Sequence, residues 1–151
     1  LEETNLLDAV RSALAFAKSA MREISVKVHS EKAVPKALVS VNSLQQVLFN
    51  LITNAAQAMN GKGALEISIL KEGECYRINV RDNGPGIPPE KLTHIFDPFF
   101  TSKQEGMGTG LGLSIVRSLI HKMGARIEVS STVGAGTEFR IFLPRQVEVV
   151  E

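Results

Sequence analysis

A glycine-rich run directly precedes an apolar helical pattern, and it constrains this chain more than any other feature. Residues 106–116 read Gly-Met-Gly-Thr-Gly-Leu-Gly-Leu-Ser-Ile-Val, with four glycines at alternate positions. Because glycine has no Cβ, backbone amides in such a run can approach a ligand closely. The helix that follows adds unpaired N–H groups and the positive end of its dipole, which favour an anion, most often a phosphate. The run therefore predicts a phosphate-binding element at the start of a helix.

Two common phosphate-binding motifs do not match this run. A P-loop requires Lys and then Ser or Thr after its last glycine, and no Lys follows these glycines. A dinucleotide-binding fingerprint that starts at Gly106 places its third glycine on Leu111, and one that starts at Gly108 places it on Leu113. Both motifs are therefore excluded.

Length and composition are those of one soluble globular domain. The chain has 151 residues, of which 44% are hydrophobic and 22% charged. Its net charge is only +1, so we expect neither nucleic-acid binding nor direct contact with an anionic membrane. No apolar run approaches the roughly 18 residues of a membrane span. Cys75 is the single cysteine, which fits a reducing compartment, and a cytoplasmic location is expected.

Periodicity predicts three helices. Apolar residues recur at helical spacing over about 5–24, 43–59 and 110–123. Ser43 is the expected N-cap of the second helix. The expected core stripe of the third helix consists of Leu111, Ile115, Leu119 and Met123.

Alternation of apolar and polar residues predicts a sheet. The expected strands are 25–30, 64–70, 75–81, 126–130 and 137–143, with a further short apolar run at 37–41. No repeat or linker divides the sequence, so one domain is expected. Because the helices separate from a mostly antiparallel sheet, the expected fold class is α+β: a two-layer α/β sandwich with a mixed sheet of about five strands packed on three helices.

The second predicted helix carries amides along one face. Gln46, Asn50, Asn54 and Gln57 fall within one narrow stripe. The opposite face is apolar and consists of Val47, Leu48, Leu51, Ile52, Ala55 and Met59. A solvent-facing polar side is one interpretation, but such sides usually carry Lys and Glu, and Asn is a poor helix former. Because an amide oxygen can coordinate Mg²⁺, we interpret Asn50 and Asn54 as ligand groups.

The segment Asp82-Asn83-Gly84-Pro85-Gly86 has two interpretations. Asn-Gly and Pro-Gly are ordinary turn pairs, so the segment is consistent with a simple turn after a strand. Asp82 also continues an apolar strand, which would bring its carboxylate to the edge of the core, where it needs a hydrogen-bond donor. The exocyclic amine of adenine is one such donor, and Ile87 would then be placed to pack on the base. Both interpretations stay open on these residues alone.

Residues 95–103 read Ile-Phe-Asp-Pro-Phe-Phe-Thr-Ser-Lys and form an apolar segment that Pro98 interrupts. At least one of Phe96 and Phe99 is expected to anchor this segment to the core. The polar, glycine-containing residues that follow are typical of a mobile cover over a ligand. Lys103 would then reach a phosphate as a point charge.

The segment 132–137, Thr-Val-Gly-Ala-Gly-Thr, is typical of a hairpin turn around Gly134. Thr137 begins the last predicted strand and could reach the position of Asp82. The histidines at 29, 94 and 121 have no partner at metal-ligand spacing, so we expect exposed or core-edge residues rather than a metal site.

In this order and spacing, the motifs resemble those of the ATP-binding catalytic domain of sensor histidine kinases. The N box is matched by Gln46-x-x-x-Asn50-Leu-x-x-Asn54-Ala, the G1 box by Asp82-x-Gly84-x-Gly86, the F box by Phe96-Asp-Pro-Phe-Phe, the G2 box by Gly108-Thr-Gly110-Leu-Gly112-Leu and the G3 turn by Gly134-x-Gly136-Thr. The resemblance covers residues 6–143 and looks closest to the nitrogen-sensor subgroup. It implies the Bergerat ATP-binding fold that these kinases share with gyrase, Hsp90 and MutL proteins.

The resemblance also implies roles for individual residues. ATP would bind between the helices and the cover, Asn54 would coordinate Mg²⁺, and Asp82 would read the adenine amine. The residues expected to act in catalysis are Asn50, Asn54 and Lys103. The residues expected to contact the nucleotide are Asn54, Asp82, Gly84, Gly86, Ile87, Phe96, Lys103, Gly108, Thr109, Gly110, Leu111, Gly112 and Thr137.

The implied reaction is transfer of the γ-phosphate to a histidine on a separate helical dimerisation domain of the same kinase, and then to an aspartate of a response regulator. Residues 1–4 would end the linker from that domain, 5–145 would form the catalytic domain and 146–151 a C-terminal tail. None of the three histidines has the acidic neighbour of the family's phosphoacceptor motif. The chain alone is therefore expected to bind ATP without phosphorylating itself.

Two departures from the superfamily pattern bear on the chemistry. Asn50 stands where the hydrolysing members carry a Glu as general base, and because Asn cannot take a proton, it argues against efficient ATP hydrolysis. No Lys or Arg lies near Gln57, where many kinases of the family have one, which leaves more of the charge neutralisation to Lys103. Two alternatives are an ATPase or protein-serine kinase on the same fold, and a degenerate nucleotide-binding module that only holds partners.

Overall fold

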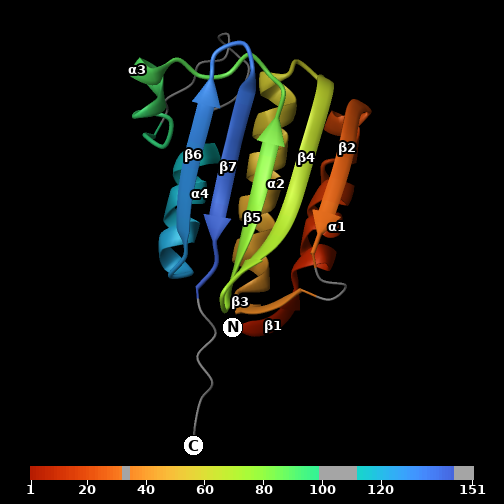
Figure 1. The fold of residues 1–151 in the computed structure, drawn as a ribbon, viewed down its shortest axis with the longest axis vertical. Helices are drawn as coiled ribbons and strands as arrows, with labels where there is room; N and C mark the ends of the chain where they lie inside the picture. The colour runs from red at the N-terminus through yellow and green to blue at the C-terminus, as the bar shows by residue number, and fades with distance from the viewer. Residues whose placement is uncertain (32–34, 99–111, 145–151) are drawn as a thin grey trace, which may run out of the picture.

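A five-stranded mixed sheet with helices on one face forms the body of the domain (Figure 1). The computed structural model describes residues 1–31, 35–98 and 112–144. The sheet order is β2-β4-β5-β7-β6, with β2 parallel to β4 and the other neighbours antiparallel. The strands are β2 Glu23–Ser30, β4 Lys62–Glu72, β5 Cys75–Asp82, β6 Arg126–Thr132 and β7 Gly136–Phe142. The predicted α+β sandwich is therefore confirmed.

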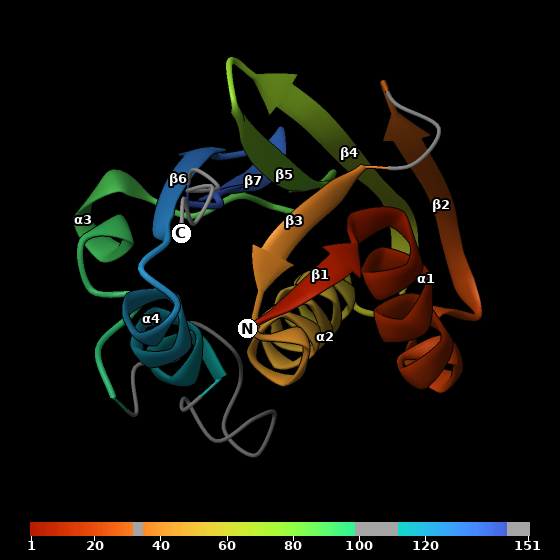
Figure 2. The same ribbon diagram turned by 90° about the horizontal axis from the view of Figure 1, so that it is seen from below.

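Three helices cover one face of this sheet: α1 Leu6–Phe16, α2 Val41–Ala58 and α4 Gly112–Lys122. Figure 2 shows them in a row on the same side, with α2 between the other two. A single helical turn, α3 Pro89–Leu92, follows β5 and lies apart from this row. In the described part of the chain, no helix is long and apolar enough to cross a membrane.

The core lies between the helices and the sheet. The apolar face predicted for α2 is buried there, since Leu48, Leu51 and Ile52 have no exposed surface. The sheet contributes the inward residues of three strands: Leu65, Ile67, Ile69, Ile78, Val80, Phe139 and Ile141, all at most 2% exposed. Alternation along these strands leaves their other face polar and open to solvent. Helical and strand periodicity thus predicted the two layers of the core correctly.

Residues 1–4, predicted to end a linker, lie mainly in a strand. Strand β1, Glu2–Asn5, pairs antiparallel with β3, Lys36–Val39, in a separate two-stranded sheet. Asn5 then caps α1, because its side-chain oxygen accepts hydrogen bonds from the backbone N–H groups of Leu7 and Asp8 at 3.0 and 3.2 Å. The start of the chain is therefore tied to the fold at the edge of α1.

The first helix is shorter than predicted. Instead of continuing to residue 24, α1 ends at Phe16, a 3₁₀ turn covers Lys18–Met21 and β2 begins at Glu23. Ala17, Met21 and Ile24 are nevertheless all buried, at 2%, 8% and 7% exposure. The spacing of the buried apolar residues thus continues while the backbone changes from helix to strand. Periodicity alone therefore predicted a helix that is too long.

For the helices, one further expectation was wrong and another was confirmed only in part. Ser40, not Ser43, caps α2, since its Oγ accepts from the Ser43 backbone N–H at 3.4 Å, and the Ser43 side chain is buried in the first turn. In α4 Val116 and Ile120 are buried while Ile115 is 37% exposed, contrary to the expected stripe. Two members of that stripe are confirmed, since Met123, just after the helix, is buried and Leu119 packs partly buried against the core; Leu111 lies outside the described residues. Both stripes of α4 are apolar and lie side by side, so the pattern did not show which one faces the sheet.

Candidate functional site

Four elements that carry the predicted site residues converge at one end of the sandwich, the upper end in Figure 1. These are the C-terminal half of α2, the C-terminal end of β5, the first turn of α4 and the turn between β6 and β7. Gly84, which follows β5, lies against the end of α2, so that a Cβ on it would be 3.3 Å from Met59 Cγ and 3.6 Å from the Ala58 carbonyl oxygen. Asp82 pairs in register with Thr137. Segments distant in the sequence therefore share this end.

Asp82 is the last residue of β5, and its side chain is only 4% exposed. It shares the inward face with Ile78 and Val80, as the sequence predicted. Its carboxylate accepts hydrogen bonds from the backbone N–H groups of Gly84, at 2.8 Å, and of Thr137. Burial raises the pKa of Asp82, and these two bonds counteract only part of the rise. A carboxylate has about four lone-pair positions, so this one can accept a further donor.

Asn50 and Asn54 lie one turn apart on the same side of α2, away from its apolar face. The side-chain nitrogen of Asn50 is buried and has no hydrogen-bond partner among the described residues. A buried donor left unpaired costs about 1–3 kcal/mol, so such an atom usually has a ligand or a water molecule as its partner. Because the amide can be turned over, the same position can present either a donor or an acceptor. This atom is therefore available to a polar ligand or a water molecule beside α2.

Ser131, which sequence reasoning missed, connects three segments at this end. Its Oγ accepts from the Ile87 backbone N–H at 2.7 Å, lies 2.8 Å from Thr137 Oγ1 and donates to the Gly136 carbonyl at 3.0 Å. Ile87 and Thr137 are both predicted site residues, and Thr137 is 7% exposed. Sequence reasoning could have found Ser131 from the register of the β6–β7 hairpin, which places it opposite Thr137.

Phe96 packs edge-on against Phe139, with ring centroids 6.3 Å apart and planes at 76°. This confirms that Phe96 anchors its segment to the core. Gly112 is the first residue of α4, and a Cβ on it would meet no atom within 4 Å. The other predicted residues of the cover and the glycine run lie outside the described residues: Phe99, Lys103, Gly108, Thr109, Gly110 and Leu111.

The glycines of the two turns hold the strands close together. Gly86 has a φ of 78°, and a Cβ there would be 2.2 Å from the Thr132 carbonyl oxygen. Gly136 has a φ of 128°, and a Cβ there would be 2.0 Å from the Asp82 carbonyl oxygen. Gly134, by contrast, has open space around it and serves the hairpin turn, as expected. Gly86 and Gly136 are thus needed for the close approach of backbones around Asp82.

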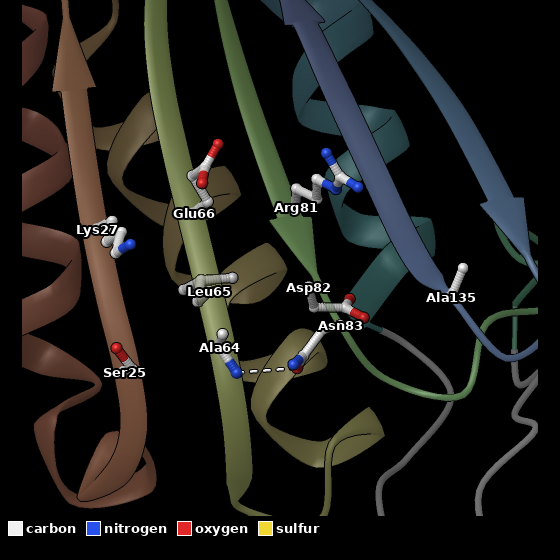
Figure 3. Close-up of a pocket in the computed structure, with 9 residues that line it drawn as sticks. All are labelled: Ser25, Lys27, Ala64, Leu65, Glu66, Arg81, Asp82, Asn83 and Ala135. Carbon is white, nitrogen blue, oxygen red and sulfur yellow. Dashed lines mark hydrogen bonds between the residues drawn. The ribbon is translucent and has the colours of Figure 1, made fainter.

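A hollow of about 320 Å³ lies on the open face of the sheet (Figure 3). Figure 3 shows Lys27, Glu66 and Arg81 on three adjacent strands in front of the helices. The full lining is Ser25, Lys27, Ala64, Leu65, Glu66, Arg81, Asp82, Asn83 and Ala135. This hollow is across the sheet from α2, where Asn50 and Asn54 lie, and it shares Asp82 with the candidate site.

Comparison with known proteins agrees with this geometry. The family model of histidine kinase-, DNA gyrase B- and HSP90-like ATPases matches residues 39–147. The sensor histidine kinase ZraS of Escherichia coli K12 is 37% identical over 123 residues, which cover 82% of this chain and 26% of ZraS. The chain therefore spans about a quarter of the length of this relative.

Two solved proteins, the histidine kinase ThkA and ShkA, have the same fold as this chain. The catalytic domain of ThkA is 31% identical with a TM-score of 0.84, over 96% of this chain and 97% of that one; ThkA has also been solved in complex with the response regulator TrrA. Full-length ShkA in complex with AMPPNP is 26% identical with a TM-score of 0.85, over 96% of this chain and 31% of that one. On the family match, which covers residues 39–147, the chain belongs to the histidine kinase-, DNA gyrase B- and HSP90-like ATPase family.

Proposed function

We propose that this domain binds Mg²⁺-ATP and donates the γ-phosphate to a histidine on a separate helical dimerisation domain of the same sensor kinase, for relay to a response-regulator aspartate. The observation that carries the proposal is a buried carboxylate, Asp82, at the same end of the fold as the unpaired buried amide of Asn50. The two groups are of the kinds that a purine base and a metal-bound phosphate chain require.

Asp82 is suited to hold the adenine. Its carboxylate is buried and already accepts two backbone hydrogen bonds, which fix its orientation without using all of its lone pairs. An adenine amine would supply the missing donor. Ile87 is partly buried and packs against the core beside this position, so its side chain is available to pack on the base.

Asn54 and Asn50 are suited to hold Mg²⁺ and the phosphates. The amide oxygen of Asn54 is a hard ligand of the kind that Mg²⁺ prefers, and the unpaired side-chain N–H of Asn50 can donate to a phosphate oxygen. When bound, Mg²⁺ would neutralise charge that develops on the phosphate oxygens. Neither asparagine can take a proton from water, which favours transfer to another acceptor over hydrolysis.

The relatives support the same function. AMPPNP, the nucleotide in the ShkA structure, is an ATP analogue, and TrrA in the ThkA complex is a response regulator. Positioning and charge neutralisation are most of what phosphoryl transfer requires of a protein. The elements that converge around Asp82 and α2 supply positioning of this kind.

Asn54→Ala is expected to weaken Mg²⁺-dependent binding of a non-hydrolysable ATP analogue by about 100-fold, because the metal loses its protein oxygen ligand. Calorimetric titration with and without Mg²⁺ measures this change. The matched control is Asn42→Ala, an exposed asparagine at the opposite end of the same helix. Equal affinity in wild type and Asn54→Ala would contradict the metal assignment and favour a degenerate binding module.

Transfer is tested separately, with radiolabelled ATP and the dimerisation domain of the parent kinase supplied as a second protein. We expect label on the histidine of that domain and none on this chain alone. Label released only as inorganic phosphate would favour the ATPase alternative.

A further inference from the structure

The hydroxyl of Ser131 lies at the centre of a hydrogen-bond network beside the proposed adenine position. It is within 3.0 Å of three polar atoms: the Ile87 backbone nitrogen, the Gly136 carbonyl oxygen and Thr137 Oγ1. These atoms belong to the turn after β5, the start of β7 and the inward face of β7. Ser131 therefore connects the turn after β5 with the start of β7, two of the segments beside Asp82.

A count of protons assigns a direction to each of these bonds. A serine hydroxyl has one proton to donate and two lone pairs to accept with. The Ile87 N–H can only donate, so it occupies one lone pair of Ser131. The Gly136 carbonyl can only accept, so it takes the Ser131 proton. The contact with Thr137 Oγ1, at 2.8 Å, then requires the threonine hydroxyl to be the donor.

This direction determines what Thr137 can offer to a ligand. Its only hydroxyl proton is used on Ser131, so the remaining capacity of Thr137 Oγ1 is as an acceptor. Thr137 is opposite Asp82 in the β5–β7 register, and both side chains are on the buried face of the sheet. The Asp82 carboxylate is also an acceptor. Two neighbouring acceptors favour a ligand that presents an N–H donor and disfavour one that presents a carbonyl oxygen.

We propose that Ser131 is a specificity-determining positioning residue, which orients the Thr137 hydroxyl proton away from the base and so makes the site select a 6-amino purine over a 6-oxo purine. The inference rests on the proposed function, because it concerns the base of the nucleotide bound there. Ser131 acts through Thr137 and Ile87.

The test compares binding of ADP and of inosine diphosphate, each with Mg²⁺, because the two bases differ at the 6-position, where an oxo group replaces the amino group, and at the adjacent N1, which gains an N–H. Wild-type protein is expected to prefer ADP. In Ser131→Ala the Thr137 proton is free to turn towards a 6-oxo group, so the ratio of the two dissociation constants should fall about tenfold. Ser131→Thr keeps a hydroxyl on the strand and should restore the ratio. Ser130→Ala, whose hydroxyl bonds Arg140 on the open face of the sheet, is the matched control.

Each outcome decides the matter. Equal weakening of both nucleotides by Ser131→Ala, with the ratio unchanged, would show a structural role only and overturn the inference. The inference would also be overturned if Ser131→Thr did not restore the wild-type ratio of the two dissociation constants. Should Ser131→Ala not fold, Thr137→Val removes the same oriented hydroxyl, and an unchanged ratio there contradicts the inference. Wild-type protein that binds neither nucleotide would instead overturn the proposed function.

Discussion

Gly136→Ala is expected to lower the free energy of unfolding by about 2–5 kcal/mol, because it combines backbone strain with an overlap of backbone atoms. The φ of Gly136 is 128°, a conformation that residues with a side chain rarely adopt. The new Cβ would be 2.0 Å from the Asp82 carbonyl oxygen and 3.1 Å from Asn83 Cα. Both atoms belong to the backbone and cannot move aside without separating β5 from β7.

Gly134→Ala is the matched control for this prediction. Gly134 also has a positive φ, of 85°, but a Cβ there meets no atom within 4 Å. Its cost should be limited to the conformational strain of a left-handed residue, about 1–2 kcal/mol. Urea unfolding of both variants measures the difference. Equal destabilisation of the two would show that β7 does not approach the Asp82 carbonyl closely in solution.

The close approach at Gly136 also affects the site. Strand pairing at this point places Thr137 opposite Asp82 and supplies the backbone N–H that the Asp82 carboxylate accepts. A folded fraction of Gly136→Ala should therefore bind nucleotide more weakly than the same amount of wild-type protein. The glycine is required for the position of the carboxylate as well as for the fold.

Local periodicity was enough to predict most of the fold. Helix α2 and the β4–β5 hairpin have strong patterns, and each was predicted within two residues at the ends nearest the site. The pairing of β1 with β3 was not predicted because β1 has four residues and its partner begins at Lys36, some thirty residues later. Two serines three residues apart could each have capped α2, and only the backbone shows that Ser40 does.

The candidate site also contains residues that local sequence patterns predict and residues that they do not. Asp82 could be predicted because it ends an alternating strand, and the asparagines because they share one face of a helix. Ser131 could not, since its role arises from the register of β6 on β7 and from a turn more than forty residues earlier. Gly86 was expected to contact a nucleotide, and Gly136 was expected only as part of the G3 turn. The structure adds that each also allows two strand ends to approach, a need that no local pattern reveals.

Asp82→Asn is expected to weaken nucleotide binding by about 100-fold, because the amide presents a donor where the adenine amine needs an acceptor. Asp8→Asn, in the first turn of α1, is the matched control and should leave the affinity unchanged. Wild-type affinity should itself fall with decreasing pH, because a protonated Asp82 has lost an acceptor. Burial raises the pKa of this carboxyl, so the fall should begin at a higher pH than for an ordinary aspartate.

The same substitution should change how stability depends on pH. Because the pKa of Asp82 is raised in the folded state, the folded domain binds a proton here more tightly than the unfolded chain. In wild type this contributes stability that is complete below about pH 3.9 and is lost as the pH rises through the raised pKa. Asparagine does not titrate, so the Asp82→Asn variant does not lose stability in this way as the pH rises. The Tm of the variant minus the Tm of wild type should therefore increase as the pH rises from about 3.9 through the raised pKa of Asp82. Thermal unfolding from pH 4 to pH 8 measures this difference, which cancels the titration of all other groups. A difference that stays constant, or that falls with increasing pH, would mean that the Asp82 carboxylate is not desolvated in the folded domain, and the argument for a buried acceptor of the adenine amine would be lost.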